Sequence, residues 1–195
     1  LMQTMASLDK VCEHLHLPLQ AGSNRILDRM GRGYTREKYL DLILKLRHLI
    51  PDVSITTDII VGFPGETEQD FNETLDMLRK VQFDGAFTFE YSPIPGTKAA
   101  QFKDQVPQVV KRRRLRKLIE VQREITEERN KLWIGKTVEV LVEGVSEKNP
   151  EELQGRTRYN RIVVFPGKEE LIGEFVQVKI KEGGCWALHG EMVDC

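Results

Sequence analysis

Cysteine is scarce in this 195-residue sequence, and the scarcity excludes two kinds of scaffold. The three cysteines, Cys12, Cys185 and Cys195, form no C-x-x-C pair and lie far apart in the chain. The sequence therefore supports neither a disulfide framework nor a metal site of the C-x-x-C kind. Each thiol is expected to be a small buried or terminal side chain.

Long hydrophobic runs are also absent. The stretch 40–50 is interrupted by charged residues and falls short of the ~18–20 apolar residues that a membrane span needs. There is no basic-then-apolar leader with a small-residue cleavage site. Together with 40% hydrophobic and 30% charged residues, these absences predict a globular cytoplasmic protein.

The charge that is present is distributed unevenly. Residues 1–104, 105–131 and 132–195 carry net charges of −3, +5 and −3, and the basic side chains gather in the run Lys111–Arg114. Such a cluster attracts phosphate groups. A solvated helix face whose later glutamates form i,i+4 pairs is an equally available interpretation.

The first hundred residues alternate between strand-like and helix-like segments. Period-two patterns predict strands at 12–20, 53–62 and 85–92, and helices are expected to start at Ser23, Thr35 and Thr67, the last with the capping box Thr67-x-x-Asp70. Strands separated by amphipathic helices are parallel and joined by right-handed crossovers. The segment 1–105 is therefore predicted to be α/β.

One side of each predicted strand is polar, whereas both sides of a strand in a doubly covered sheet should be apolar. The polar sets are His14, His16 and Gln20, then Ser54, Thr56 and Asp58, then Thr88, Glu90 and Ser92. We expect these side chains to line the lumen of a partial (βα) barrel, although strand ends near solvent would give the same pattern. Three βα units do not close a barrel, which indicates part of a larger domain.

The remaining sequence predicts a connector and a second domain. Apolar spacing after Pro107 predicts a basic helix of about six turns, so 106–131 is assigned as a connecting helix. Alternating patterns at 136–145, 155–165, 175–182 and 185–192, separated by glycines, predict a small all-β barrel over 132–195.

A glycine-rich turn joins the second strand to its helix. Gly62 and Gly65 have no Cβ, so a ligand could approach the backbone there, beside a helix N-terminus that favours negative charge. Simple tight-turn geometry explains the glycines equally well. The run matches neither the phosphate-cradling G-x-x-x-x-G-K-[ST] motif nor the dinucleotide motif G-x-G-x-x-G.

Four segments in order, 16–23, 30–35, 57–67 and 91–97, resemble the second half of the radical S-adenosylmethionine (SAM) domain of the methylthiotransferases. The terminal β barrel resembles a TRAM domain, an OB-like RNA-binding module. Its run 155–161 is most similar to the tRNA-modifying, MiaB-type branch of the family.

The resemblance implies an enzyme that adds a methylthio group to carbon 2 of an isopentenylated adenosine beside the anticodon. In the family, one 4Fe-4S cluster on a C-x-x-x-C-x-x-C loop cleaves SAM, and a second cluster takes part in sulfur delivery. Neither the loop nor the second-cluster domain is in this sequence. The fragment is therefore expected to bind no cluster and to be inactive alone; its implied partners are the tRNA anticodon stem-loop and the missing amino-terminal half.

The matching motifs imply a set of SAM-binding residues: Gln20, Ser23, Arg32, Asp58, Gly62, Phe63 and Pro64. Arg32 suits a carboxylate or phosphate because it is planar and always charged, but it could equally be an ordinary surface arginine. Ser23 could serve only as a helix N-cap. Glu66 lies one place later than the acidic residue of the family pattern, which weakens a direct role for it.

The barrel supplies the expected RNA-binding residues, to which the basic helix adds two. Arginines interleaved with an aromatic give phosphate contacts and a stacking surface; the residues are Arg156, Arg158, Tyr159, Asn160, Arg161, Arg112 and Arg113. A charged hairpin with Tyr159 in the core is the alternative. Phe165, Trp186 and His189 are interpreted as core and rim residues.

Two other functions stay open on the sequence. A ribosomal-protein methylthiotransferase would share the barrel motifs and use its last domain to hold protein. A stand-alone RNA-binding module would have no chemistry. Uncovered strand edges and helix faces also predict that the isolated chain self-associates.

Overall fold

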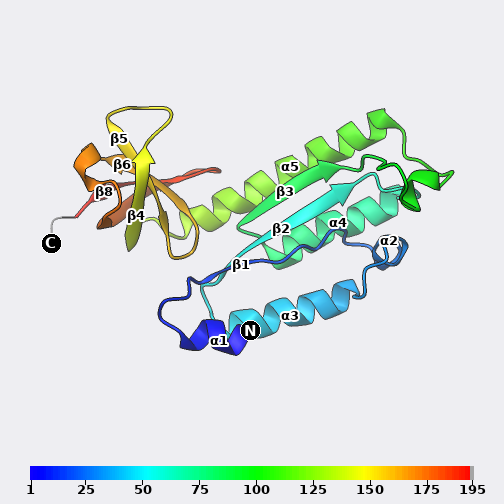
Figure 1. Cartoon of the computed structure of the whole chain (residues 1–195), viewed down its shortest axis with the longest axis horizontal. Coiled ribbons are helices and arrows are strands. Elements are labelled where there is room, and N and C mark those ends of the chain that lie inside the picture. The colour runs from blue at the N-terminus through cyan, green and yellow to red at the C-terminus, as the bar shows by residue number, and fades with distance from the viewer. Residues whose placement is uncertain (194–195) are drawn as a thin grey trace. The chain divides into compact units, whose positions relative to one another are not determined.

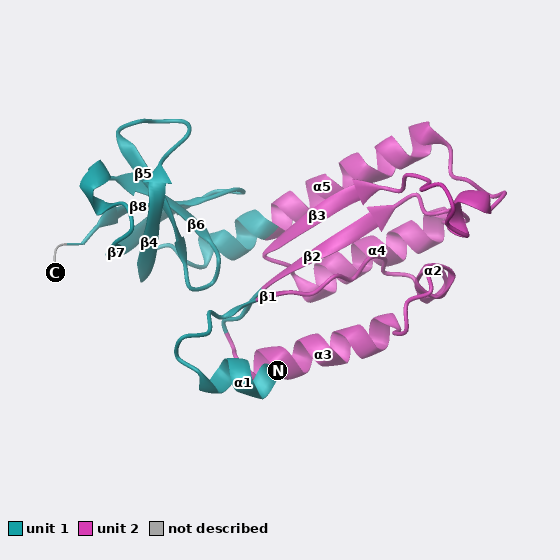
Figure 2. Cartoon of the chain, in the orientation of Figure 1, with its two compact units in different colours: residues 1–14, 52–54, 126–195 teal, residues 15–51, 55–125 magenta. Residues whose placement is uncertain are grey.

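The computed structural model describes residues 1–193, so Cys195 lies outside the described part. The chain forms two compact units (Figure 2). We call residues 15–51 and 55–125 the sheet unit. Residues 1–14, 52–54 and 126–193 are the barrel unit. Within 1–193, no helix is both long enough and apolar enough to span a membrane.

The helices and strands follow one another as Figure 1 labels them. The amino-terminal elements are α1 (Met2–Ser7), β1 (His14–His16), α2 (Asn24–Arg29), α3 (Arg36–Leu49), β2 (Ser54–Val61), α4 (Glu68–Val81), β3 (Gly85–Glu90), the 3-10 helix η1 (Ala99–Gln101) and α5 (Gln108–Lys131). The carboxy-terminal elements are β4 (Thr137–Val145), β5 (Glu152–Thr157), β6 (Ile162–Pro166), the 3-10 helix η2 (Glu169–Leu171), β7 (Phe175–Gly183) and β8 (Leu188–Met192).

The sheet unit is built on a three-stranded sheet of order β1-β2-β3, in which β2 and β3 are parallel. The first strand is shorter than the predicted 12–20. Pro18 has no N–H to donate to a ladder, and Gln20 has a left-handed φ of 68°. Gln20 still pairs with β2, because its N–H donates to the Asp58 carbonyl at 2.8 Å and its carbonyl accepts from Ile60 N at 2.9 Å.

One face of the sheet is buried. Ile55, Thr57, Ile59 and Val61 of β2 are all fully buried, and α4 and α5 run behind the sheet in Figure 1. The predicted caps hold two of the helices in place: Thr35 accepts from Lys38 N at the start of α3, and the Thr67 capping box is present at the start of α4.

The opposite face differs from the prediction at the third strand. The register pairs Asp58 with Phe87 and Ile60 with Phe89, so both phenylalanines share the open face with Thr56 and Asp58. Thr88 and Glu90 pair with Ile59 and Val61 and belong to the buried face; Ser92 follows the end of the strand. The expected polar set on this strand was therefore wrong, because a shift of one residue moves every side chain to the other face.

The barrel unit contains a closed barrel of order β4-β5-β6-β8-β7. Val138, Val140 and Val142 alternate into its core, as predicted, at 8%, 0% and 1% exposure. The single strand predicted at 155–165 was wrong: it is the hairpin β5–β6, and the chain reverses between Thr157 and Ile162, where Asn160 has a φ of 58°. The last strand starts at Leu188, later than predicted.

Candidate functional site

The turn after β2 is fixed by backbone conformation and by one buried carboxylate. Gly62 and Gly65 have φ values of 74° and 80°, which L side chains rarely adopt. The Gly62 N–H donates to Glu66 Oε2 at 2.7 Å. The glycines of this turn are therefore required by its geometry, whether or not a ligand binds there.

Glu66 forms a buried ion pair with Arg114 of α5. The Nη1···Oε2 distance is 2.7 Å, and the side chains are 5% and 1% exposed for Arg114 and Glu66. Arg114 Nη1 also donates to the Glu66 carbonyl at 3.1 Å. Burial raises the pKa of Glu66, although the Gly62 amide and Arg114 both oppose the rise. Glu66 thus anchors the turn to α5, a role that the sequence analysis missed.

Asp70 is the second buried acceptor near the turn. Its carboxylate accepts hydrogen bonds from Ser23 Oγ at 2.6 Å, from Thr67 and from Arg25. Burial alone would raise the pKa of Asp70, but the hydrogen bonds from Arg25, Ser23 and Thr67 hold it well below its ordinary value. Ser23 lies at the N-cap of α2 without a side-chain capping bond, because its hydroxyl is directed to Asp70.

The aromatic part of the turn is packed into the unit. The Phe63 ring lies edge-on to Tyr91, with centroids 5.1 Å apart, and to Phe102 at 6.4 Å. It belongs to a buried cluster with Ala21, Ile26 and Leu27. Pro64 is buried as well. Phe63 and Pro64 therefore pack in the interior of the sheet unit beneath the backbone of the turn.

The open face carries a polar cluster. His16 Nδ1 lies 3.0 Å from Thr56 Oγ1, and His16 Nε2 lies 3.3 Å from Asp58 Oδ1. The Asp58 side chain is 30% exposed. Gln20 is next to Asp58 through the backbone hydrogen bond described above, whereas Arg32 is exposed in the turn that follows α2. The structure therefore brings Gln20 and Asp58 together and leaves Arg32 at the surface.

The described cysteines do not form a cluster site. Cys12 is exposed and Cys185 is half-buried, and both are free thiols. Within residues 1–193, no group of three or more His, Cys, Asp or Glu side chains could hold a metal ion. The residues that are described therefore do not fit an iron–sulfur cluster.

The basic run of α5 is divided between the interior and the surface. Lys111 is 6% exposed, donates to the Tyr91 carbonyl at 2.8 Å and lies over the Tyr91 ring. Arg114 is buried against Glu66, while Arg113 pairs with Glu68 at 2.6 Å with its side chain 64% exposed. Arg112 is exposed. Neither sequence interpretation anticipated that two members of this run lie in the core.

In the β5–β6 hairpin of the barrel unit, Arg158 forms hydrogen bonds to the segment 9–13. Its Nε and Nη2 donate to the two carboxylate oxygens of Glu13, both at 3.0 Å. Nη2 also donates to the carbonyls of Asp9 at 2.7 Å and Val11 at 3.0 Å. The hydrogen bonds from Arg158 hold the pKa of Glu13 below its ordinary value. This arginine binds the segment that precedes β1.

Two further hairpin residues pack on Trp133. The Tyr159 ring lies 4.8 Å from the Trp133 ring, centroid to centroid. The Arg161 guanidinium lies over Trp133 at 5.2 Å, and Arg161 is 7% exposed and donates to Asn130 Oδ1. This arrangement is the alternative in which Tyr159 contributes to the core, and it leaves the ring half-buried.

Among the predicted RNA-binding residues of the hairpin, Arg156 and Asn160 are exposed. Arg156 Nη1 donates to Asn160 Oδ1 at 2.8 Å, and its Nε donates to Glu143 at 3.2 Å. Trp186 is 71% exposed and precedes β8, so it lies at the rim, whereas Phe165 is fully buried. His189 is exposed on β8.

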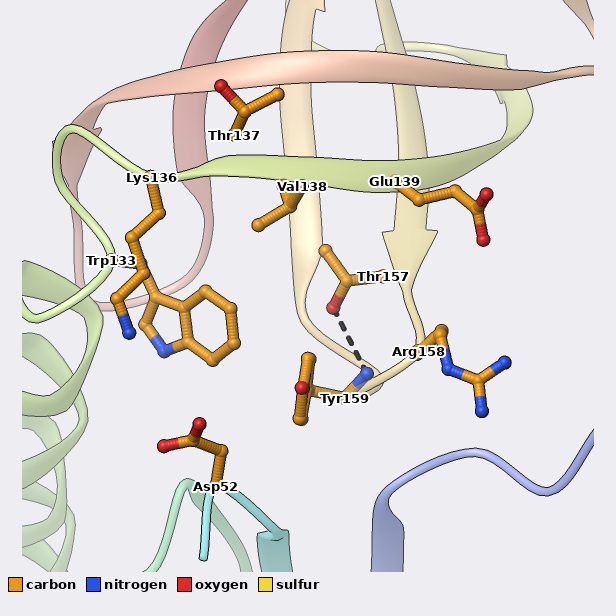
Figure 3. A pocket seen from close by; sticks show the side chains of 9 residues that line it. All are labelled: Asp52, Trp133, Lys136, Thr137, Val138, Glu139, Thr157, Arg158 and Tyr159. Atoms are coloured by element: carbon orange, nitrogen blue, oxygen red, sulfur yellow. Dashed lines mark hydrogen bonds between the residues drawn. The ribbon is translucent and has the colours of Figure 1, made fainter. Parts of the chain in front are cut away.

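A pocket of about 260 Å³ adjoins the hairpin (Figure 3). Trp133 and Tyr159 face its interior, and in this view Val138 lies above the two rings and Asp52 below them. Its full lining is Asp52, Trp133, Lys136, Thr137, Val138, Glu139, Thr157, Arg158 and Tyr159. No sequence pattern predicts this pocket, because its residues come from separate segments.

Comparisons with known proteins give independent evidence on the family. Residues 1–78 match the Radical SAM superfamily, and residues 131–193 match the TRAM domain. The chain is 55% identical over 194 residues, 100% of its length and 44% of the relative, to a protein of Moorella thermoacetica. It is 58% identical over 192 residues, 98% of its length and 44% of the relative, to one of Carboxydothermus hydrogenoformans. A protein of Natranaerobius thermophilus is 54% identical over 194 residues, 100% of this chain and 43% of the relative.

All three relatives are named tRNA-2-methylthio-N(6)-dimethylallyladenosine synthase. The chain spans less than half of the length of these relatives. The closed five-stranded barrel coincides with the segment that matches the TRAM domain.

Proposed function

We propose, because this chain belongs to the radical SAM methylthiotransferase family, that it is the carboxy-terminal part of a tRNA-2-methylthio-N6-dimethylallyladenosine synthase. The observation that carries the proposal is the identity of 54–58% along nearly the whole chain to three proteins of that name. The complete protein would add a methylthio group to carbon 2 of the dimethylallyladenosine beside the anticodon. Neither a ribosomal-protein substrate nor simple RNA binding is favoured by a comparable observation.

The sheet unit would be half of a (βα) barrel, in segment 1–105 of the proposed domain division. Parallel sheets normally have both faces covered, yet one face of this sheet exposes Thr56, Asp58 and two phenylalanines. The missing amino-terminal half would complete the barrel and supply the ligands of both 4Fe-4S clusters. SAM, bound at such a cluster, would supply the radical chemistry and the methyl group.

Within that barrel, this chain would contribute side chains that bind and orient SAM. Asp58 and Gln20 lie at neighbouring positions of the sheet, and the Gly62–Pro64 turn follows at the carboxyl end of β2, where barrels of this kind place their sites. Asp58 can accept hydrogen bonds from hydroxyl groups on the open face. Ser23 would contribute indirectly, because its hydroxyl already donates to Asp70. Phe63 would likewise support the conformation of the turn, because its ring is packed in a buried cluster.

The barrel unit, corresponding to the TRAM segment, would bind the tRNA anticodon stem-loop. Its exposed hairpin residues Arg156 and Asn160 offer hydrogen-bond donors to phosphate, and Trp186 offers an exposed ring on which a base can stack. Arg112 and Arg113 of α5 would add phosphate contacts. Arg158 and Arg161 would contribute by holding the hairpin in shape.

The test is conversion of a defined RNA by the full-length protein. Anticodon stem-loops that contain dimethylallyladenosine are incubated with the reconstituted enzyme and SAM, and nucleosides are analysed by mass spectrometry. We expect a 2-methylthio product that disappears when SAM is omitted. A matched variant that lacks residues 132–195 should bind the stem-loop less tightly.

Two results would contradict the proposal. Methylthiolation of a ribosomal protein with none on RNA would assign the chain to the other branch of the family. RNA binding by the full-length protein without any modified nucleoside, in preparations whose clusters are shown to be intact by absorption spectroscopy, would leave only a binding module.

A further inference from the structure

Two large aromatic side chains are exposed on the open face of the sheet unit. Phe87 and Phe89 of β3 are 61% and 51% exposed. Most of the other exposed large hydrophobic residues lie in loops or at element ends, and scattered apolar residues on a surface require no explanation. A pair on one face of a parallel strand does require one, because such apolar patches usually mark a surface that something covers.

The register places this pair beside the polar cluster. Phe87 is level with Asp58, and Phe89 is level with Ile60, which is half-buried. The His16 ring meets Phe87 edge-on with centroids 5.8 Å apart, while its two nitrogens face Thr56 and Asp58. The open face therefore carries the polar cluster of His16, Thr56 and Asp58 beside an apolar part made of Phe87, Phe89 and Ile60.

We propose that Phe87 and Phe89 form the contact surface for the dimethylallyl group of the substrate adenosine. The inference rests on the proposed function, since dimethylallyladenosine enters through the names of the relatives. A dimethylallyl group is a branched five-carbon hydrocarbon with no hydrogen-bonding atom, so it gains by leaving water for an apolar contact. The nucleoside that carries it is polar and matches Thr56, His16 and Asp58.

Phe89 is expected to be the more important of the two. It is paired near the carboxyl end of the sheet, one residue before the pair Val61–Glu90 from which the Gly62 turn departs. Barrel enzymes hold the reacting group at that end. Phe87 is set two residues further from the turn and is already in contact with His16.

This arrangement makes the phenylalanines specificity determinants, with an effect that binding can measure. Even one methylene in an apolar pocket discriminates substrates by about 10-fold or more. Partial burial of five carbons on two exposed rings should therefore favour the dimethylallyl form of the RNA by roughly 10- to 100-fold.

The experiment uses the full-length protein and two anticodon stem-loops that differ only in the dimethylallyl group. Dissociation constants for both are measured by fluorescence anisotropy, and their ratio is the readout. Phe89→Ala should reduce the ratio toward one and leave the affinity for the unmodified RNA within about twofold. Phe89→Leu, which remains apolar, should retain most of the ratio, and Phe87→Ala should show a smaller loss.

Phe175→Ala is the matched control, because Phe175 is 65% exposed but lies on β7 of the barrel unit. Its ratio should equal that of the unchanged protein. If Phe89→Ala does not fold, Phe89→Leu and Phe89→Tyr decide the question, since the tyrosine hydroxyl would disturb an apolar contact.

A ratio unchanged in Phe89→Ala, or in Phe89→Tyr where the alanine variant does not fold, would overturn the inference, as would an equal loss of affinity for both RNAs. A lowered melting temperature with an unchanged ratio would show that the rings pack against the remainder of the protein. In each of these cases the unchanged enzyme would still produce the 2-methylthio nucleoside. Failure of the proposed function would instead abolish that product for every variant and for the unchanged protein.

Discussion

The sheet unit and the barrel unit are stabilised by different kinds of side chain. The barrel closes around an apolar cluster that includes Val140, Phe165 and Ile180, each fully buried. Among residues 1–193, Arg161 is the one buried charged residue of the barrel unit. The sheet unit instead buries five, namely Glu66, Asp70, Asp84, Lys111 and Arg114.

The difference follows from what each unit must hold in place. In a closed barrel every strand is hydrogen-bonded to a neighbour on both sides, so an apolar core is enough to hold the strands in place. The sheet unit must also hold a turn in which Gly62 and Gly65 contribute no side chain to the packing and have left-handed backbone conformations. Glu66 and Asp70 fix that turn by accepting hydrogen bonds from Gly62 N and from Thr67. The expected consequence is that single charge deletions damage the sheet unit far more than the barrel unit.

The largest effect is expected from Arg114→Ala. Removing one partner of a buried ion pair leaves an uncompensated carboxylate, so the variant should lose about 3–5 kcal/mol of stability. Hydrogen exchange followed by mass spectrometry should show faster exchange in 55–81 and little change in 137–192. Arg113→Ala is the control, since Arg113 pairs with Glu68 at the surface and should cost less than about 1 kcal/mol. Equal losses in the two variants would contradict the contrast between the units.

Asp70→Asn should give an intermediate effect that depends on pH. The folded-state pKa of Asp70 lies below its ordinary value, so its contribution is fully present above the unfolded pKa of about 4. It is lost as the pH falls through the lower folded pKa. Asp70→Asn should therefore cost roughly 1–2 kcal/mol at pH 7 and progressively less as the pH falls below about 4.

Urea unfolding at pH 7, 5 and 3 measures this difference. Asp41→Asn serves as the control, because Asp41 pairs with Lys45 while both are more than 60% exposed. Its stability difference from the unchanged protein should be near zero at every pH. A difference for Asp70→Asn that grows toward acid pH would show that the carboxylate is not stabilised in the folded state.

The sequence predicted the elements whose signals are local. The capping box at Thr67 and the helix after Pro107 were confirmed, as was the inward alternation of Val138, Val140 and Val142. Each of these features depends only on residues within one or two helical turns or within a single strand. The family resemblance was confirmed as well, since it uses several such motifs in order.

The errors arose where partners are distant in the chain. The sequence does not show which side chains of β3 share a face with Asp58, because that depends on the register between β3 and β2. Phe87 and Phe89 were therefore not predicted to lie on the open face. Local sequence does not indicate the role of Glu66, because its partner, Arg114, lies 48 residues away within a run of basic residues. The chain reversal between Thr157 and Ile162 was not predicted, because residues 158–161 contain neither glycine nor proline.

The smallest effects are expected in the hairpin, where two arginines of similar sequence context should behave differently. Arg156 is exposed, and its contacts with Glu143 and Asn160 lie at the surface, so Arg156→Ala should weaken stem-loop binding a few-fold and reduce the slope of log affinity against log salt by about 1. Arg158 is engaged by Glu13 and two carbonyls, so Arg158→Ala should leave that slope unchanged and cost only about 1 kcal/mol of stability. Filter-binding titrations of the full-length protein between low and moderate salt measure both. If Arg158→Ala reduced the salt slope of binding more than Arg156→Ala, RNA would have to displace Glu13 from Arg158. The barrel unit would then, like the sheet unit, use an ion pair at its binding surface.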